Sequence, residues 1–136
     1  MIVDASIILR AFFPDEAQPE AQALLRDHVS GRVQLTAPTL LVYEMTNAVL
    51  QAVRRERVTS EDAEAILVAV EGLNIETESV PWQQMLPLAR RFDRSAYDAA
   101  YLALAEARGE SLITGDEKLY NAVHNHLDWV QWIGDL

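Results

Sequence analysis

Four acidic residues lie in segments that are otherwise strongly apolar: Asp4, Glu44, Asp98 and Asp116. Asp98 is the clearest case, because Ala and Leu dominate residues 95–107, and a helix apolar on nearly every side is expected to be buried. An unpaired carboxylate in such a place is costly and must find hydrogen bonds or a cation. Carboxylates that share a hard cation such as Mg²⁺ or Mn²⁺ support hydrolysis of a phosphodiester bond, since the metal activates water and stabilises the leaving oxygen.

Helix capping is the competing interpretation for three of these acids. Asp4 and Asp116 each stand between a short apolar run and a helical segment, where an aspartate is a favoured N-cap. Ser95 and Asp98 fit a capping box, in which Ser95 is the N-cap and Asp98 closes back from the third helical position. The local sequence leaves both interpretations open for these three residues.

Glu44 is not explained by capping, because it lies in the middle of an expected helix. Asn47 and Gln51 follow it at i+3 and i+7, so the three residues form one polar stripe on a mainly apolar helix that is otherwise expected to be buried. The alternative for this stripe is a narrow face turned to solvent. Beside a site, Asn47 could instead position Glu44 or a substrate.

The expected elements alternate between short apolar strands and helices, which favours an α/β fold with a mainly parallel sheet. We expect strands near residues 1–4, 33–37, 74–80, 111–114 and 129–133. We expect helices near residues 5–13, 18–30, 38–55, 59–72, 81–92, 95–108 and 117–126, with Pro38 in the first turn of the third. Because carboxyl ends of parallel strands meet at one sheet edge, Asp4, Asp98 and Asp116 would share that edge.

Length and composition narrow the class of protein. At 136 residues, the chain is expected to form a single domain spanning 1–136. It has no cysteine, which excludes disulfides and thiolate metal sites. No apolar run approaches the ~20 residues needed to span a bilayer, and the N-terminus lacks the basic region of a signal peptide. We therefore expect a cytoplasmic protein that does not bind membranes.

The formal net charge of −10 disfavours nonspecific binding to nucleic acid. A nucleic-acid role would then depend on metal ions or on local basic patches. Two such patches are Arg54, Arg55 and Arg57, and Arg90, Arg91 and Arg94. Each patch could equally be the solvated end of a helix, where cations are favoured.

Four motifs resemble the signatures of PIN domains. They are Val3-Asp4-Ala5-Ser6, Tyr43-Glu44-x-x-Asn47-Ala48, Tyr97-Asp98-Ala99-x-Tyr101-Leu-Ala-Leu-Ala105 and Thr114-Gly115-Asp116. Their order, their spacing and the chain length also resemble the VapC toxins of toxin–antitoxin pairs, across essentially the whole chain. Each motif alone is weak, but four in this order are specific. The resemblance implies a three-layer α/β/α sandwich with a parallel five-stranded sheet, and Mg²⁺- or Mn²⁺-dependent RNA endonuclease activity.

The resemblance also implies roles for individual residues. Asp4, Glu44, Asp98 and Asp116 would bind one or two metal ions, with Ser6, Asn47 and Thr114 in support. Our hypothesis is that the aspartates hold metal, that Glu44 binds metal or orients the attacking water, and that arginines guide RNA phosphates. Those arginines are Arg54, Arg55, Arg90, Arg91 and Arg94. Glu117 directly follows Asp116, and spacing does not settle which of the two points at metal.

Partners are implied in the same way. VapC-like proteins usually form homodimers and are inhibited by a VapB-like antitoxin that lies across the acidic groove, often inserting an arginine. A basic segment would complement the strong negative charge of this chain.

Other classes of protein share some of these features. The chain could be a PIN nuclease of RNA processing without a toxin role. It could also be a non-catalytic module whose acids only cap helices or bind an antitoxin. Glu44 argues against the module, since capping does not explain this residue. A haloacid-dehalogenase-like enzyme requires Asp-x-Asp after the first strand, where this chain has Asp4-Ala5-Ser6. A receiver domain requires an acidic pair before its phosphorylated aspartate, and that order is missing. The three histidines look peripheral.

Overall fold

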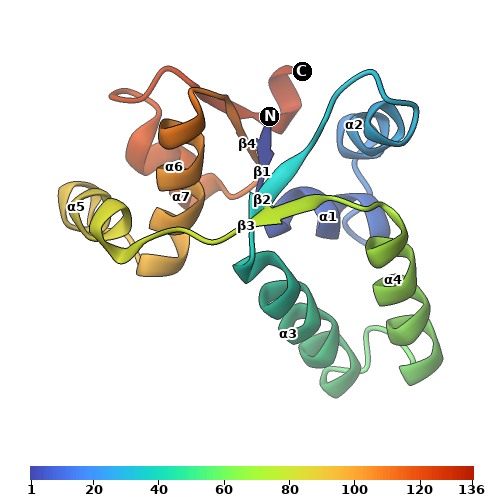
Figure 1. The fold of residues 1–136 in the computed structure, drawn as a ribbon. Coiled ribbons are helices and arrows are strands. Elements are labelled where there is room, and N and C mark those ends of the chain that lie inside the picture. Colours follow the sequence, from blue (N-terminus) through green and yellow to red (C-terminus); the bar gives the residue numbers. More distant parts are fainter.

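The computed structural model describes residues 1–136 and contains a five-stranded sheet in which all neighbouring strands are parallel. The strands, in the order β3-β2-β1-β4-β5 across the sheet (Figure 1), are β1 (Ile2–Val3), β2 (Thr36–Pro38), β3 (Glu76–Glu78), β4 (Leu112–Thr114) and β5 (Val130–Trp132). The central strands β2, β1 and β4 are buried, whereas β3 at the sheet edge is exposed. The apolar runs therefore form the middle of the sheet, as in other parallel sheets covered on both faces.

Helices cover both faces of the sheet and produce three layers (Figure 1). One side carries α1 (Ala5–Phe12), α2 (Pro19–Val29), α3 (Leu40–Arg54) and α4 (Ser60–Gly72), and the other carries α5 (Trp82–Phe92), α6 (Ala96–Arg108) and α7 (Glu117–Val123). A 3-10 turn, Ile133–Asp135, follows β5. The predicted α/β/α sandwich with a parallel five-stranded sheet is confirmed. No helix combines the length and the apolar character needed to cross a membrane.

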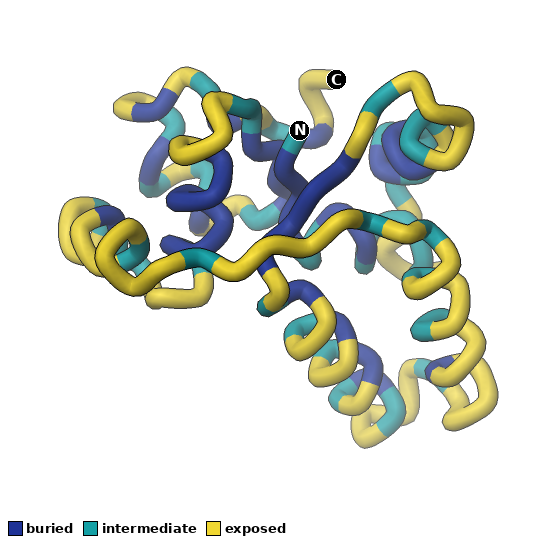
Figure 2. The backbone as a smooth tube through the Cα atoms, in the orientation of Figure 1, coloured by how far each residue is buried: buried dark blue, intermediate teal, exposed yellow.

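Helix α6 is the buried helix that its Ala- and Leu-rich sequence predicts. Every residue from Ala99 to Ala105 is at most 5% exposed, and the helix packs on β1, β2 and β4 (Figure 2). Ser95 caps its start, and Gly109 ends it in the left-handed conformation with φ of 65°. Asp98 is thereby placed in the first turn, immediately before the buried stretch.

Two expectations about the third helix are wrong. Pro38 is the last residue of β2, in register with Glu78 of β3, and α3 begins only at Leu40. Pairing with a strand 40 residues away decides this, because a proline fits a strand end and a first helical turn equally well. Nor is α3 buried on all its apolar sides, since Val42 and Tyr43 are 61% and 73% exposed.

The strand order places β1 and β4 at the point where the chain reverses its direction of travel across the sheet. The chain first runs outward from β1 through β2 to β3, then crosses to the other side of β1 to form β4 and β5. Val3 is in register with Ile113, so the next residues, Asp4 and Thr114, are neighbours at the carboxyl ends of the two strands. In open α/β sheets, ligands bind in the crevice at such a switch point.

Candidate active site

Asp4 lies at this switch point and joins α1 to β4. It is 5% exposed; its Oδ1 accepts hydrogen bonds from the Ser6 backbone nitrogen, at 3.1 Å, and from the Ser6 hydroxyl. Its Oδ2 accepts a hydrogen bond from the Thr114 hydroxyl. Burial raises the pKa of Asp4 to about 6; the bonds from Ser6 and Thr114 oppose this rise, and the charge of Asp116 adds to it.

The loop after β4 is hydrogen-bonded to the same residues. The Gly115 backbone nitrogen donates to the Ser6 hydroxyl at 2.8 Å, and the Asp116 backbone nitrogen donates to the Thr114 hydroxyl at 2.9 Å. Asp116 also caps α7, because its Oδ1 accepts from the Leu119 backbone nitrogen at 3.1 Å. The capping roles predicted for Asp4 and Asp116 are therefore confirmed, and they hold both carboxylates at the sheet edge.

Glu44 is half-buried on α3 and has a partner that the sequence did not reveal. The Tyr101 hydroxyl, on α6, donates to Glu44 Oε1 at 2.5 Å. Burial raises the pKa of Glu44, the Tyr101 bond opposes that rise, and the charges of Asp98 and Asp116 add to it. Tyr101 itself is 2% exposed, and burial together with the charge of Glu44 raises its pKa, so it remains a protonated donor. A solvent-facing stripe does not describe Glu44.

Asp98 is half-buried, and its carboxylate makes no hydrogen bond. Its backbone nitrogen donates to the Ser95 hydroxyl at 3.0 Å, so capping uses the main chain and leaves the carboxylate free. Only this half of the expected capping box forms. Burial and the charge of Asp116 raise the pKa of Asp98, and the charge of Arg94 lowers it.

In this set of four carboxylates, the acid cluster, Asp4, Glu44 and Asp98 all lie within electrostatic reach of Asp116. Burial is the largest cause of the raised pKa of Asp4, Glu44 and Asp98, and the charge of Asp116 adds to the rise in all three. Glu117 is exposed and contributes to none of them. Asp116, rather than Glu117, is thus the member of the cluster that the loop supplies.

The chemistry of the donors in the acid cluster fits a hard divalent cation. All are carboxylate oxygens, with no thiolate or imidazole nearby, and this set favours Mg²⁺ or Mn²⁺ over zinc. Close carboxylates repel one another, and a cation would relieve that repulsion. As the side chains stand, no three of them are close enough together to hold one ion.

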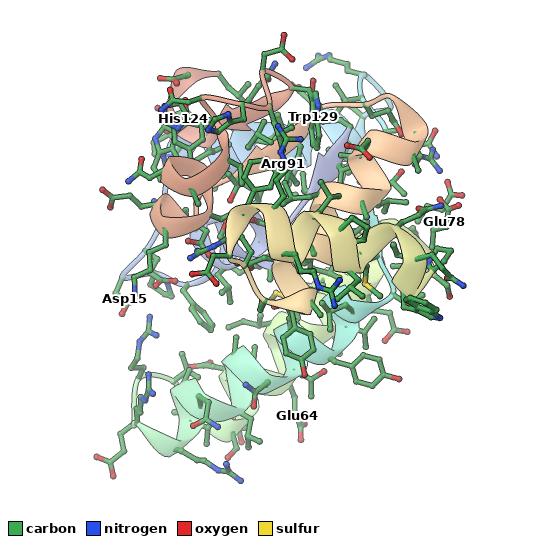
Figure 3. All side chains as sticks on the ribbon, turned by 90° about the vertical axis from the view of Figure 1, so that its left-hand side faces the viewer. Asp15, Glu64, Glu78, Arg91, His124 and Trp129 are labelled. Carbon is green, nitrogen blue, oxygen red and sulfur yellow. The ribbon has the colours of Figure 1, made fainter.

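Of the two basic patches, the one before α6 lies nearer to the acid cluster. Arg94 is half-buried and is the only basic residue whose charge lowers the pKa of an acid in the cluster, that of Asp98. Arg90 and Arg91 are exposed on α5, and the Arg91 guanidinium lies 4.6 Å from the ring centre of Phe92 on the face shown in Figure 3.

The structure does not bring Arg54 and Arg55 to the acid cluster. Both are exposed at the far end of α3, roughly 15 Å along the helix axis from Glu44 at the usual helical rise. Asn47, one turn after Glu44, is exposed and makes no hydrogen bond, so it is open to a substrate but does not hold Glu44.

The histidines lie outside the acid cluster. His28 is structural, because its Nδ1 accepts from the Leu35 backbone nitrogen at 3.1 Å and its Nε2 lies 2.8 Å from the Leu73 carbonyl oxygen. Helix α7 ends earlier than expected, before His124 and His126, and His124 lies at the periphery of the molecule (Figure 3).

The chain is similar to known proteins along most of its length. A family model described as PIN domain matches residues 1–125. Ribonuclease VapC3 of Pyrobaculum aerophilum is 29% identical over 123 residues, which are 88% of this chain and 91% of that protein. The crystal structure of PAE2754, also from Pyrobaculum aerophilum, matches with a TM-score of 0.76 and 25% sequence identity, over 98% of this chain and 90% of that one.

Proposed function

The chain belongs to the PIN-domain family, and from this membership we propose that it is a Mg²⁺- or Mn²⁺-dependent endoribonuclease whose active site is the acid cluster. One observation carries the proposal. Four carboxylates from separate elements approach one another at the topological switch point, and one of them, that of Asp98, makes no hydrogen bond. A half-buried free carboxylate that only destabilises the fold is best explained by a ligand, and a divalent cation fits. The similarity to a ribonuclease of the VapC type supports RNA as the substrate.

The aspartates are assigned as the residues that would hold one or two ions. Asp4 and Asp116 are oriented for this by their caps and by the hydroxyls of Ser6 and Thr114. Asp98 approaches from α6, on the other face of the sheet. When bound, the metal would activate water and neutralise charge on the phosphate.

Glu44 is assigned as the group that orients the attacking water and accepts its proton. Tyr101 occupies Oε1, while Oε2 makes no hydrogen bond within the protein. A half-buried carboxyl with a raised pKa is better matched to proton transfer near neutral pH than an ordinary glutamate. Asn47 is positioned one turn further along α3, where it could contact the RNA. The arginines that would contact phosphates are Arg54, Arg55, Arg90, Arg91 and Arg94.

The test is cleavage of a panel of end-labelled RNAs by the purified protein with Mn²⁺, with EDTA, and with the Asp98→Asn variant. We expect cleavage that requires metal and is lost in the variant, which keeps its cap because the Ser95 bond uses the main chain. Asp128→Asn is the matched control, since Asp128 is exposed and makes no hydrogen bond. Cleavage that survives EDTA or Asp98→Asn would contradict the proposal. So would inactivity combined with no effect of Mn²⁺ on the melting temperature.

A toxin role is the finer part of this proposal and rests on the likeness to Ribonuclease VapC3. We expect a homodimer that covers the exposed apolar residues of α3, and a VapB-like antitoxin whose basic segment lies over the acid cluster. Induced expression should arrest growth, and Asp98→Asn should not. Cleavage in vitro without growth arrest would favour an RNA-processing nuclease instead. The mass in solution, measured by light scattering, tests the dimer.

A further inference from the structure

Arg10 is a cationic side chain near the acid cluster for which neither motif nor family provides a role. It projects from α1, the helix that Asp4 caps, and one of its terminal nitrogens donates to the Gly115 carbonyl oxygen at 2.7 Å. The other donates to Gln18 Oε1 at 2.9 Å. Its guanidinium also lies 5.5 Å from the ring centre of Trp132 in β5. Arg10 therefore joins α1, the start of α2, the β4–α7 loop and the last strand.

Two glycines leave the space that this arrangement occupies. A Cβ on Gly115 would lie 2.5 Å from Arg10 Nε and 2.7 Å from Arg10 Cδ. A Cβ on Gly134 would lie 2.8 Å from Nε1 of Trp132, the residue beside the Arg10 guanidinium. Gly115 does not have a positive φ, so its glycine is explained by this close approach and not by backbone conformation.

Arg10 makes its hydrogen bonds to neutral groups and not to carboxylates. It forms no ion pair, although the chain holds 21 acidic residues, and both of its hydrogen-bond acceptors are neutral oxygens. A planar guanidinium can serve two acceptors and stack on an indole at the same time, which a lysine cannot do. This pattern is typical of a side chain that orients its neighbours.

Those contacts fix the peptide unit that leads into Asp116. Arg10 holds the carbonyl oxygen of this unit, and the Thr114 hydroxyl holds its nitrogen, which belongs to Asp116. The preceding peptide is held by Ser6 through the Gly115 nitrogen. Both polar groups of the Gly115–Asp116 peptide unit are thereby hydrogen-bonded, which restrains its rotation.

We propose that Arg10 is a positioning residue for Asp116: by clamping the Gly115 carbonyl against β5, it sets the direction in which the Asp116 carboxylate enters the acid cluster. The consequence for catalysis rests on the proposed function, whereas the clamp itself does not. The two can therefore be tested separately.

The clamp is tested by amide hydrogen exchange in ¹⁵N-labelled protein, comparing Arg10→Met with wild type and with Arg54→Met as the matched control. We expect the Asp116 amide to exchange faster in Arg10→Met while the buried amides of α6 keep their rates. A merely structural role would speed exchange throughout the fold. Unchanged exchange at Asp116 would overturn the inference, whether or not the protein is a nuclease.

The catalytic consequence is tested with Mn²⁺ titration and RNA cleavage. We expect Arg10→Met to lower Mn²⁺ affinity or kcat by about 10- to 100-fold, as for other residues that orient a metal ligand, with little change in KM. Gly115→Ala should give the same loss, because its new Cβ displaces the Arg10 side chain. Arg10→Lys, which retains one donor, should recover part of it.

A double-mutant comparison separates positioning from general destabilisation. In an Asp116→Asn background, Arg10→Met should cause no further loss of Mn²⁺ affinity, because its effect passes through the Asp116 carboxylate. An equal loss in both backgrounds would contradict the proposal. If wild type neither binds Mn²⁺ nor cuts RNA, the proposed function fails, and the exchange experiment still decides the role of Arg10.

Discussion

Raising the pH from 4 to 7 should weaken the metal-free protein because of one buried carboxylate. Below pH 3.8, Asp4 is protonated in both the folded and the unfolded chain. Between 3.8 and about 6 the unfolded chain releases this proton while the folded chain retains it, so stability falls as pH rises and levels off above 6. At about 1.4 kcal/mol for each pH unit, this gap corresponds to a loss of roughly 3 kcal/mol.

Urea denaturation in EDTA at a series of pH values measures this loss. Asp15 and Glu110, whose pKa values are lowered by Arg57 and by the N-terminal amine, give the opposite slope, so the informative quantity is the difference between wild type and Asp4→Asn. For a chain of this size, the wild-type midpoint should fall by about 1 to 2 M urea relative to the variant.

The amide of Asp4→Asn can retain the bond from the Ser6 nitrogen and contact Thr114, so the variant removes the titration more than the packing. Asp128→Asn should follow wild type. Parallel curves for wild type and Asp4→Asn between pH 4 and 7 would refute the idea that Asp4 is a buried, strained acid. Mn²⁺ at about 100 times its Kd should restore about 2.7 kcal/mol at neutral pH.

Three further substitutions test other parts of the site. Tyr101→Phe removes the only hydrogen bond to the Glu44 carboxylate and should lower kcat in the RNA assay while the protein stays folded by circular dichroism. Thr114→Val leaves a carboxylate oxygen and a backbone nitrogen without partners, and should cost about 1–3 kcal/mol in urea denaturation, whereas Thr114→Ser should cost less. Joint replacement of Arg54 and Arg55 by Ser should raise KM and reduce the salt dependence of RNA binding, because contacts with phosphates are lost. It should leave kcat unchanged, because both residues lie far from the acid cluster. A fall in kcat would place them at the catalytic site.

Much of the architecture could be predicted from local sequence. The buried character of α6 was visible in its Ala- and Leu-rich composition, and Ser95 was recognisable as its cap. These features depend on residues within one or two turns of each other, where propensity and capping act directly. The position of Pro38 was not predictable, because it depends on pairing with β3.

The acid cluster was predictable in part. The four acids were identifiable because each interrupts an apolar segment, and two of them are also the caps that the local sequence predicts. Tyr101 could have been suspected, since it lies three residues after Asp98 on the same helix face. Arg10 could not, because its partners lie 8 and 105 positions away along the chain.

The sequence by itself determined which carboxylates are costly to bury: those embedded in apolar segments that a parallel sheet must bury. Only the tertiary structure decided what those carboxylates face. Crossing the chain from β3 back to β4 places Asp4 beside Thr114, and α6 carries Tyr101 to Glu44. Such contacts join residues more than 50 positions apart in the chain. Electrostatic coupling depends on the distance between charges in space, and the order of residues along the chain does not give that distance.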